Sequence, residues 1–342
     1  MKTLVLKVDP RKIDFEKIDL AAEEIKKGNL VAFPTETVYG LGADAYNEEA
    51  VKKIFQVKGR PYYDPLIVHI AELSDLERLS REIPSVAWLL ADTFWPGPLT
   101  LVVKKSKLVS PLVTANLDTV AVRMPANCIA LSLIKRAQTP IVAPSANLFG
   151  RTSPTQAQHV LEDLNGKIEV IIDGGETRVG VESTVLDITV EPVQVLRAGG
   201  ISLEQLHKVI DQVALNRELE RDFRSPGRLK SHYSPRAKLI LVEKKGEEQI
   251  KEVYNLASQY TSLGYKVGIM VKEENKERYQ DFQIKVLGKG NRLSSCAANL
   301  FKILRNFDQE GFEVIIAEGL EEKGLGLAIM ERLRKASVNN IS

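Results

Sequence analysis

The sequence has few of the residues that hold metals or form disulfides: its 342 residues include two cysteines and four histidines. Cys128 and Cys296 lie far apart without metal-site spacing, so a reducing compartment is the simplest inference. The histidines form no cluster, which argues against a zinc centre. We recognise neither a Ser-His-Asp nor a Cys-His arrangement, so the sequence does not favour nucleophilic catalysis by a side chain.

Long apolar runs, a signal peptide and an excess of one charge are also missing. We therefore expect a cytoplasmic protein without a membrane segment. The 47 basic and 45 acidic residues leave a formal net charge of +2, so no basic tail indicates nucleic acid, although a local basic face is compatible with this balance. The length favours two domains over one.

The order of the predicted elements supports that division. Strand and helix patterns alternate over residues 1–211, with glycine- or proline-rich strand ends, which predicts one α/β domain. Residues 212–237 lack a hydrophobic period and are predicted to be a linker. Residues 238–342 again alternate strands with helices, which is typical of a small doubly wound parallel sheet.

Residues 141–155 are the most informative stretch. A short buried strand at 141–143 runs into Pro144 and then into a run of small polar residues. Ser153 and Pro154 resemble an N-cap and a first helical position, which predicts a helix over 155–164. A helix N-terminus beside such a strand end can bind phosphate, but an ordinary polar loop explains the same residues.

Charged and polar residues at other strand and helix ends allow two readings each. Lys58 and Arg60 follow a helix predicted over 47–57, and they either face solvent or hold a polyphosphate. Arg123 lies on a buried strand, so it needs an acidic partner or an anionic ligand. His69 is either a half-buried histidine or a ligand contact, and residues 34–42 form either a substrate-contacting loop or a plain one.

The predicted linker is both cationic and aromatic. It contains Arg224, Arg228, Lys230, His232, Tyr233 and Arg236. A solvated tether is the ordinary explanation of such a composition. The alternative is that His232 and Tyr233 fold over a bound ligand as a lid.

Taken together, these motifs resemble the threonylcarbamoyl-AMP synthase family, the YrdC-like enzymes of tRNA modification. The matching segments are PTETVYGLG at 34–42, KGRP with PL at 58–66, WPGPLT at 95–100, VAVRMP at 120–125, APSAN with SPT at 143–155, DGG at 173–175, ESTV at 182–185 and LRAGG at 196–200. The SPG…HYSP segment and the α/β tail resemble the long, two-domain form. Small departures are Asp64, Asn127 and Ala198, where asparagine, histidine and proline are common.

The resemblance implies a twisted open α/β sheet with a concave, positively charged groove. It implies that L-threonine, bicarbonate and ATP are joined into threonylcarbamoyl-adenylate with release of pyrophosphate, for threonylcarbamoyl-adenosine beside the tRNA anticodon. Mg²⁺ would accompany ATP, without an assured direct protein ligand. The product would pass to a tRNA threonylcarbamoyl transferase complex, and contact with tRNA is an open question.

The resemblance also implies roles for individual residues. The family's KxR and SxN signature falls on Lys58, Arg60, Ser145 and Asn147, which we expect around the phosphates and the metal. Expected nucleotide contacts are Lys58, Tyr62, Thr119, Ser145, Ser153, Arg197 and Tyr233. Expected threonine contacts are Thr35, His69, Arg123, Ala143 through its backbone, and Ser183.

Every reactant in this chemistry carries negative charge, so neutralising charge and aligning reactants are the main tasks. No general base can be named from the sequence, and we expect His69 to contact threonine rather than to act as a base. Two alternatives remain open: a double-stranded-RNA or tRNA-binding module without chemistry, and an enzyme that uses carbamoyl phosphate. The latter normally carries cysteine-rich zinc segments, which are absent here.

Overall fold

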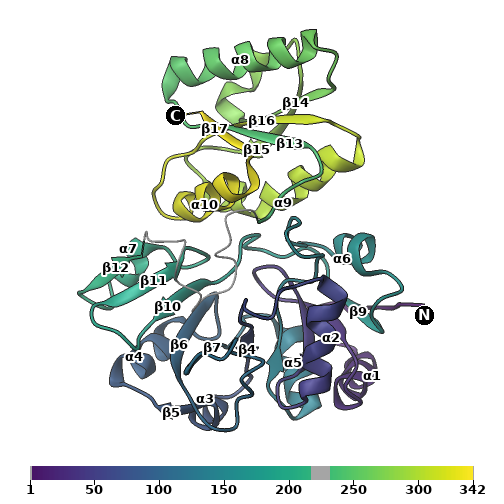
Figure 1. Ribbon diagram of the computed structural model, residues 1–342, viewed down its shortest axis with the longest axis vertical. Helices are drawn as coiled ribbons and strands as arrows, with labels where there is room; N and C mark the ends of the chain where they lie inside the picture. The colour runs from purple at the N-terminus through teal and green to yellow at the C-terminus, as the bar shows by residue number, and fades with distance from the viewer. Residues whose placement is uncertain (1, 217–231, 342) are drawn as a thin grey trace. The chain divides into compact units, whose positions relative to one another are not determined.

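A computed structural model describes residues 2–216 and 232–341, and it separates into two compact units. The first unit comprises the described residues of 1–149 and 153–228, and the second comprises those of 150–152 and 229–342 (Figure 1). The segment 150–152, which lies within the polar stretch after the 141–143 strand, therefore belongs to the second unit. Arg224, Arg228 and Lys230 of the predicted linker lie outside the described residues.

The first unit is built on a mixed sheet. Its strands are β1 (Leu4–Lys7), β2 (Val31–Pro34), β3 (Tyr39–Asp44), β4 (Ile67–His69), β5 (Ser80–Glu82), β6 (Leu99–Lys105), β7 (Thr119–Arg123), β8 (Ile141–Val142), β9 (Val170–Asp173), β10 (Thr184–Asp187), β11 (Val193–Arg197) and β12 (Val213–Leu215). Within the described residues they follow the order β1-β9-β2-β3-β8-β4-β7-β6-β10-β11-β12, and β5 pairs with β6. Parallel and antiparallel neighbours are both present, as in β4 beside β7 and β2 beside β3.

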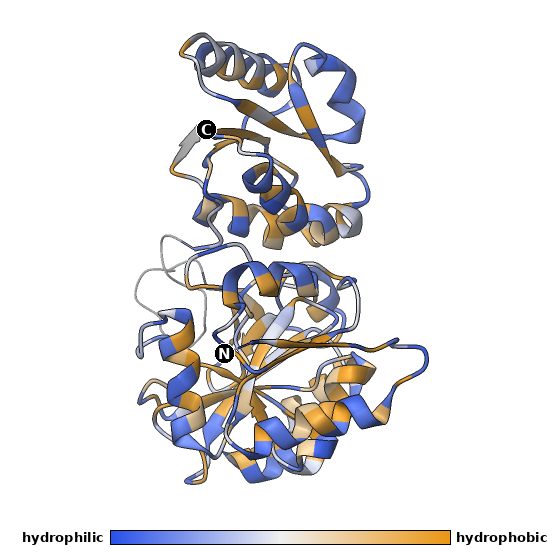
Figure 2. Ribbon diagram, turned by 90° about the vertical axis from the view of Figure 1, so that its right-hand side faces the viewer, coloured by the Kyte–Doolittle hydropathy of each residue, from blue (hydrophilic) through white to orange (hydrophobic). Residues whose placement is uncertain are grey.

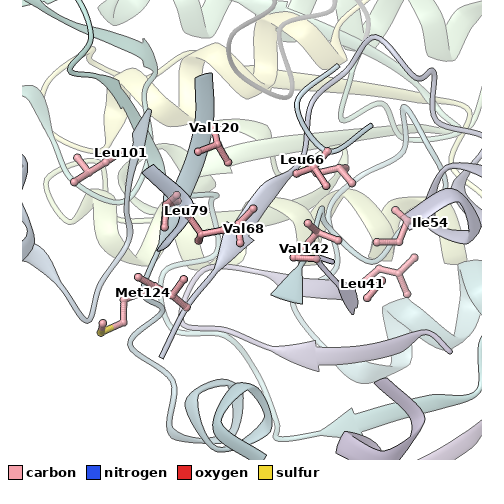
Figure 3. Close-up of a cluster of buried hydrophobic side chains, with 14 of the residues drawn as sticks. Leu41, Ile54, Leu66, Val68, Leu79, Leu101, Val120, Met124 and Val142 are labelled. Atoms are coloured by element: carbon pink, nitrogen blue, oxygen red, sulfur yellow. The ribbon is translucent and has the colours of Figure 1, made fainter. Parts of the chain in front are cut away.

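Helices cover both faces of this sheet. They are α1 (Phe15–Lys26), α2 (Glu48–Lys58), α3 (Leu73–Leu79), α4 (Ser85–Phe94), α5 (Cys128–Ala137), α6 (Ala157–Leu164) and α7 (Leu203–Leu206). Helices α1 and α5 pack on one face, against Phe33 and Ile172. The other face packs against α2, α3 and α4 and includes Leu41 of β3, Val68 of β4 and Ile54 of α2 (Figure 3). Alternate residues of each strand therefore enter different cores.

The second unit is a smaller, all-parallel sheet. Its strands β13 (Lys238–Val242), β14 (Val267–Lys272), β15 (Gln283–Gly288), β16 (Val314–Glu318) and β17 (Asn339–Ile341) follow the order β15-β14-β16-β13-β17. Its helical segments are α8 (Gly246–Ser262), the 3-10 turn η1 (Glu273–Tyr279), α9 (Leu293–Gln309) and α10 (Gly326–Ala336). Figure 1 shows α8 on one face of this sheet and α9 and α10 on the other, which confirms the doubly wound prediction.

Hydropathy follows the same layering in each unit. Apolar residues gather on the strands, while most helices carry hydrophilic residues on one side and hydrophobic residues on the other (Figure 2). Among the described helices, none combines the length and the apolar character needed to span a bilayer.

Local end signals account for several helix starts. Asn47 and Asn127 cap α2 and α5, accepting backbone N–H bonds in the first turn, and Ser202 forms a capping box with Gln205. The helix after Ser202 is short and ends at Leu206.

Three predictions of local structure were wrong. Helix α6 begins at Ala157 with Gln156 as its N-cap residue, so Ser153 and Pro154 do not start it. Residues 213–215, predicted to be linker, form β12 beside β11. Residues 34–42 are not one loop, because β2 extends to Pro34 and β3 begins at Tyr39. Gly42 lies within β3, where a Cβ atom would come within 2.8 Å of Phe33.

Candidate functional site

The short loop between β2 and β3 contacts several distant segments of the first unit. Its turn is held by Thr35, whose hydroxyl donates to the Val38 carbonyl at 2.7 Å and accepts the Thr37 N–H at 3.1 Å. The loop's backbone also bonds to distant segments. Tyr39 N–H donates to the Pro154 carbonyl, and the Glu36 and Thr37 carbonyls accept from residues 179 and 180. Three segments that are far apart in the sequence therefore meet here.

The two halves of the KxR and SxN signature are in direct contact. Lys58 ends α2, and the αL conformation of Gly59, with φ of 64°, turns the chain away. The Lys58 ammonium is buried and donates to the Ser145 carbonyl at 2.5 Å and to the Asn147 carbonyl. Burial, reinforced by the nearby Arg60 cation, lowers the pKa of Lys58 well below its usual value. The lysine thus ties α2 to the polar stretch after β8.

Arg60 is engaged by its own loop. Its Nη2 lies 2.9 Å from the Asp64 carboxylate, and both side chains are buried. The same guanidinium donates to the backbone carbonyls of Asp64 at 3.1 Å and Pro65 at 2.7 Å. Asp64 stands where asparagine is common in the family. Its carboxylate therefore neutralises part of the positive charge of Arg60.

Arg123 has the acidic partner that was one of its two predicted alternatives. Its Nη2 lies 2.7 Å from Oε1 of Glu36, and each of these side chains is only 4% exposed. The Arg123 Nε–H also donates to the Gly97 carbonyl at 3.3 Å, in the Trp-Pro-Gly-Pro turn. The ion pair thereby joins the end of β7 to the loop between β2 and β3, which is called the 34–39 loop below.

His69 lies beside Arg123, because the two residues are register partners in the parallel pair β4–β7. The imidazole is 3% exposed, and its Nδ1 has no hydrogen-bond partner among the described residues. Burial and, secondarily, the Arg123 charge lower the pKa of His69 to about 3. The ring is therefore neutral near pH 7 and can donate or accept a hydrogen bond without charge.

A further group of predicted site residues consists of Ser153, Ser183 and Arg197. The Arg197 guanidinium donates to both the carbonyl and the hydroxyl of Ser183, at 2.9 and 3.1 Å from Nη2. The Ser183 hydroxyl also lies 2.7 Å from that of Thr100. Ser153 is fully buried and donates to the Glu182 carboxylate at 2.5 Å. The 182–183 segment therefore brings together Ser153, Ser183 and Arg197.

Three other predicted residues of the first unit lie at a strand end or in a loop. Thr119 begins β7, and Ala143 uses its N–H to donate to the Ile67 carbonyl at 3.0 Å. Tyr62 is half exposed, and its ring centroid lies 4.7 Å from that of Phe55. Tyr62 thus offers an aromatic face that its own loop does not fully cover.

His232 and Tyr233 belong to the second unit. Tyr233 has a positive φ of 65° and is buried, with its ring stacked on Phe301 at a centroid distance of 5.6 Å. The Arg332 guanidinium lies over the same ring, 5.4 Å from its centroid. Tyr233 is therefore anchored by α9 and α10, and its role as a lid remains a prediction.

Sequence reasoning missed Glu36, although it quoted the segment that contains this residue. Glu36 is the only acidic residue in 34–42, and Arg123 had been predicted to need an acidic partner. Combining these two observations would have suggested the pair. Glu182 was missed in the same way, because its partner Ser153 is 29 positions earlier in the chain.

Two family models match this chain. Residues 23–199 match the family model described as "Telomere recombination", and residues 201–338 match "Threonylcarbamoyl-AMP synthase, C-terminal domain". The chain is 50% identical over 339 residues to the threonylcarbamoyl-AMP synthase of Pyrococcus abyssi, covering 98% of both chains. It is 46% identical to that of Bacillus subtilis, covering 94% of this chain and 93% of the relative.

A solved structure is similar over nearly the whole length. The crystal structure of P. abyssi Sua5 complexed with L-threonine matches with a TM-score of 0.94 and 49% identity, covering 99% of both chains. Escherichia coli YciO, at 23% identity and a TM-score of 0.51, shares the fold of the first unit. With both family models matched and relatives aligned end to end, this chain belongs to the threonylcarbamoyl-AMP synthase family, whose members are enzymes of the nucleotidyltransferase type.

Proposed function

We propose that this protein joins L-threonine, bicarbonate and ATP into threonylcarbamoyl-adenylate and releases pyrophosphate. The observation that carries the proposal is the Lys58 ammonium held between the Ser145 and Asn147 carbonyls, in the same unit as the buried Arg123–Glu36 pair. The first arrangement combines a cation with small polar groups, which suits phosphate, and the second includes a buried arginine, the side chain that best pairs with a carboxylate. The P. abyssi relative, solved with L-threonine, supports the choice of amino acid.

The nucleotide would be bound by Lys58, Arg60, Tyr62, Thr119, Ser145, Asn147, Ser153, Arg197 and Tyr233. Lys58 and Arg197 bring positive charge from different elements, which suits a substrate and a leaving group that are both polyanions. Arg60 would contribute less than its formal charge because Asp64 already pairs with it. Tyr62 offers an exposed ring on which an adenine base can stack.

Mg²⁺ is expected to enter with ATP. The Ser145 hydroxyl and the Asn147 amide oxygen are oxygen donors, the kind that Mg²⁺ prefers, and Lys58 holds their backbone together. These two residues would help to hold the ion beside the phosphates. When bound, the ion neutralises charge on the phosphates and on the departing pyrophosphate.

Threonine would be bound by Thr35, His69, Arg123, Ala143 and Ser183. Arg123 forms an ion pair with Glu36 and donates one hydrogen bond, from Nε to the Gly97 carbonyl, while its Nη2 donates none to the described residues, so donors remain for the substrate carboxylate. His69 is neutral and can form a hydrogen bond with the substrate hydroxyl. The low pKa of His69 makes it a weak proton acceptor, so it is better suited to positioning than to base catalysis.

The product would serve the formation of threonylcarbamoyl-adenosine beside the anticodon of tRNA, in the cytoplasm. It is a mixed anhydride and reacts with water, so it must pass promptly to a tRNA threonylcarbamoyl transferase complex. We propose that His232 and Tyr233 help to exclude water from the bound nucleotide.

One incubation tests the reaction. The protein is mixed with ATP, Mg²⁺, bicarbonate and labelled threonine, and the product is sought by mass spectrometry while released pyrophosphate is measured. We expect label in an adenylate, with pyrophosphate release that depends on both threonine and bicarbonate. Double-stranded RNA binding without such release would instead favour the alternative of a nucleic-acid-binding module.

A further inference from the structure

The 34–39 loop contains a buried carboxylate that the roles assigned above do not use. Glu36 is 4% exposed and follows Thr35, an expected threonine contact. Its Oε1 forms an ion pair with Arg123 Nη2 at 2.7 Å, but neither buried carboxylate oxygen accepts a hydrogen bond from the described residues. A buried carboxylate oxygen without a donor is costly, so an incoming donor would be favoured at this position.

The surroundings of Glu36 indicate what kind of donor that is. Arg123 on β7 is the charged side chain that contacts it, and His69 on β4, the register partner of Arg123, is kept neutral. The other segments packed here contribute backbone groups: the Gly97 carbonyl accepts from Arg123, and the Val179 N–H donates to the Glu36 carbonyl. A carboxylate and a guanidinium side by side are complementary to the ammonium and carboxylate of one amino acid.

From this geometry we infer that Glu36 binds the ammonium group of threonine and accepts its proton before the amine attacks bicarbonate. The inference rests on the proposed function and adds the base that sequence reasoning could not name. Binding of threonine would itself make Glu36 a better base. The carboxylate of threonine and that of Glu36 would then share the single Arg123 guanidinium, so Arg123 would stabilise the charge of Glu36 less. Transfer of the ammonium proton to Glu36 would also replace two buried charges with two neutral groups.

The steps balance. An N–H bond of the ammonium breaks, and an O–H bond forms on Glu36. The lone pair of the free amine then forms a C–N bond to the bicarbonate carbon. The C–O bond to the bicarbonate hydroxyl breaks, and this hydroxyl leaves as water after taking a second proton from the amine nitrogen. A carbamate oxygen then bonds to the α-phosphorus of ATP, and the bond to pyrophosphate breaks. Glu36 finally returns its proton to solvent.

The test compares Glu36→Gln with wild type at saturating substrates between pH 6 and 8. Glutamine keeps the size and an oxygen that can accept from Arg123, but it cannot take the proton. We expect the variant's kcat to fall about 10²–10⁴-fold, the usual range for a lost general base, with its KM for ATP within about threefold of wild type. We also expect its kcat to rise about tenfold per pH unit, because only free amine can react, while the wild-type profile stays nearly flat.

Asp187→Asn is the matched control, because Asp187 is also a buried carboxylate of the first unit but lies at the end of β10, outside the proposed site. It should keep the wild-type pH profile. If Glu36→Gln does not fold, Glu36→Asp carries the test: it retains a carboxylate and should show a lower kcat with the flat profile. A wild-type kcat and profile in Glu36→Gln, or a steep profile in Glu36→Asp, overturns the inference. Absence of product from wild type would instead refute the proposed function.

Discussion

Replacing Lys58 separates the structural role of its buried ammonium from its proposed role at the phosphates. In Lys58→Met the side chain keeps its length and loses its charge. Two hydrogen bonds from a charged donor, to the Ser145 and Asn147 carbonyls, are removed. At about 1.5–3 kcal/mol each, they would together contribute about 3–6 kcal/mol.

The loss in stability should be smaller than that sum. Burial lowers the pKa of Lys58, which shows that the folded protein holds this charge at a cost that methionine does not bear. We therefore expect a net destabilisation of about 2 kcal/mol, which is a fall of about 4–8 °C in Tm for a unit of this size. The effect on activity should be larger, about 10²–10³-fold in kcat/KM for ATP, as for other donors preorganised around developing charge.

Lys53→Met is the matched control for this experiment. Lys53 lies on the same helix, α2, and its ammonium also donates to a backbone carbonyl, that of Gly28, at 2.7 Å. Its loss should lower Tm by a comparable amount and leave pyrophosphate release nearly unchanged. Thermal melting and threonine-dependent pyrophosphate release are measured on both variants. Pyrophosphate release by Lys58→Met within threefold of wild type would refute the assignment of this lysine to the phosphates.

Three further outcomes are expected. Arg123→Ala should raise the KM for threonine far more than the KM for ATP in steady-state assays, and equal effects would contradict carboxylate binding. Because the folded pKa of His69 is about 3 and its ordinary value is 6.5, only the unfolded chain takes up this proton as pH falls below 6.5. The free energy of unfolding, measured by urea titration, should therefore fall by about 2 kcal/mol from pH 7 to pH 5, and His69→Asn should lack this part of the fall. The same pH dependence in His69→Asn as in wild type would contradict a buried, neutral His69. Deleting residues 225–342 should reduce activity, because the truncation removes Tyr233 and the helices that anchor it, and a fully active truncation would argue against a lid.

Local signals were sufficient for much of the fold. Asn47 and Asn127 were predictable as helix caps because a cap bonds to N–H groups two or three residues away. The alternation of strands and helices likewise predicted the doubly wound second unit, since its parallel strands are joined by regular crossovers. The motif residues could be recognised as candidates for the same reason: each motif is a short, contiguous segment.

Contacts between distant segments could not be predicted in this way. Ser153 resembled a helix cap, but its hydroxyl binds Glu182 and the helix starts later, because a buried charged acceptor outweighs a local cap. Likewise, Asp64 was visible beside Arg60, but only the structure shows that both are buried and 2.9 Å apart.

By itself, the sequence determined most of the elements, their order and the residues available for binding anions, because these depend on neighbours along the chain. The tertiary structure alone decided that Glu36 faces Arg123, that Lys58 lies between two carbonyls of the 145–147 segment, and that His69 is neutral. Each of these depends on strand register and on burial, which arise only when the sheet assembles and excludes water from the groups that it brings together.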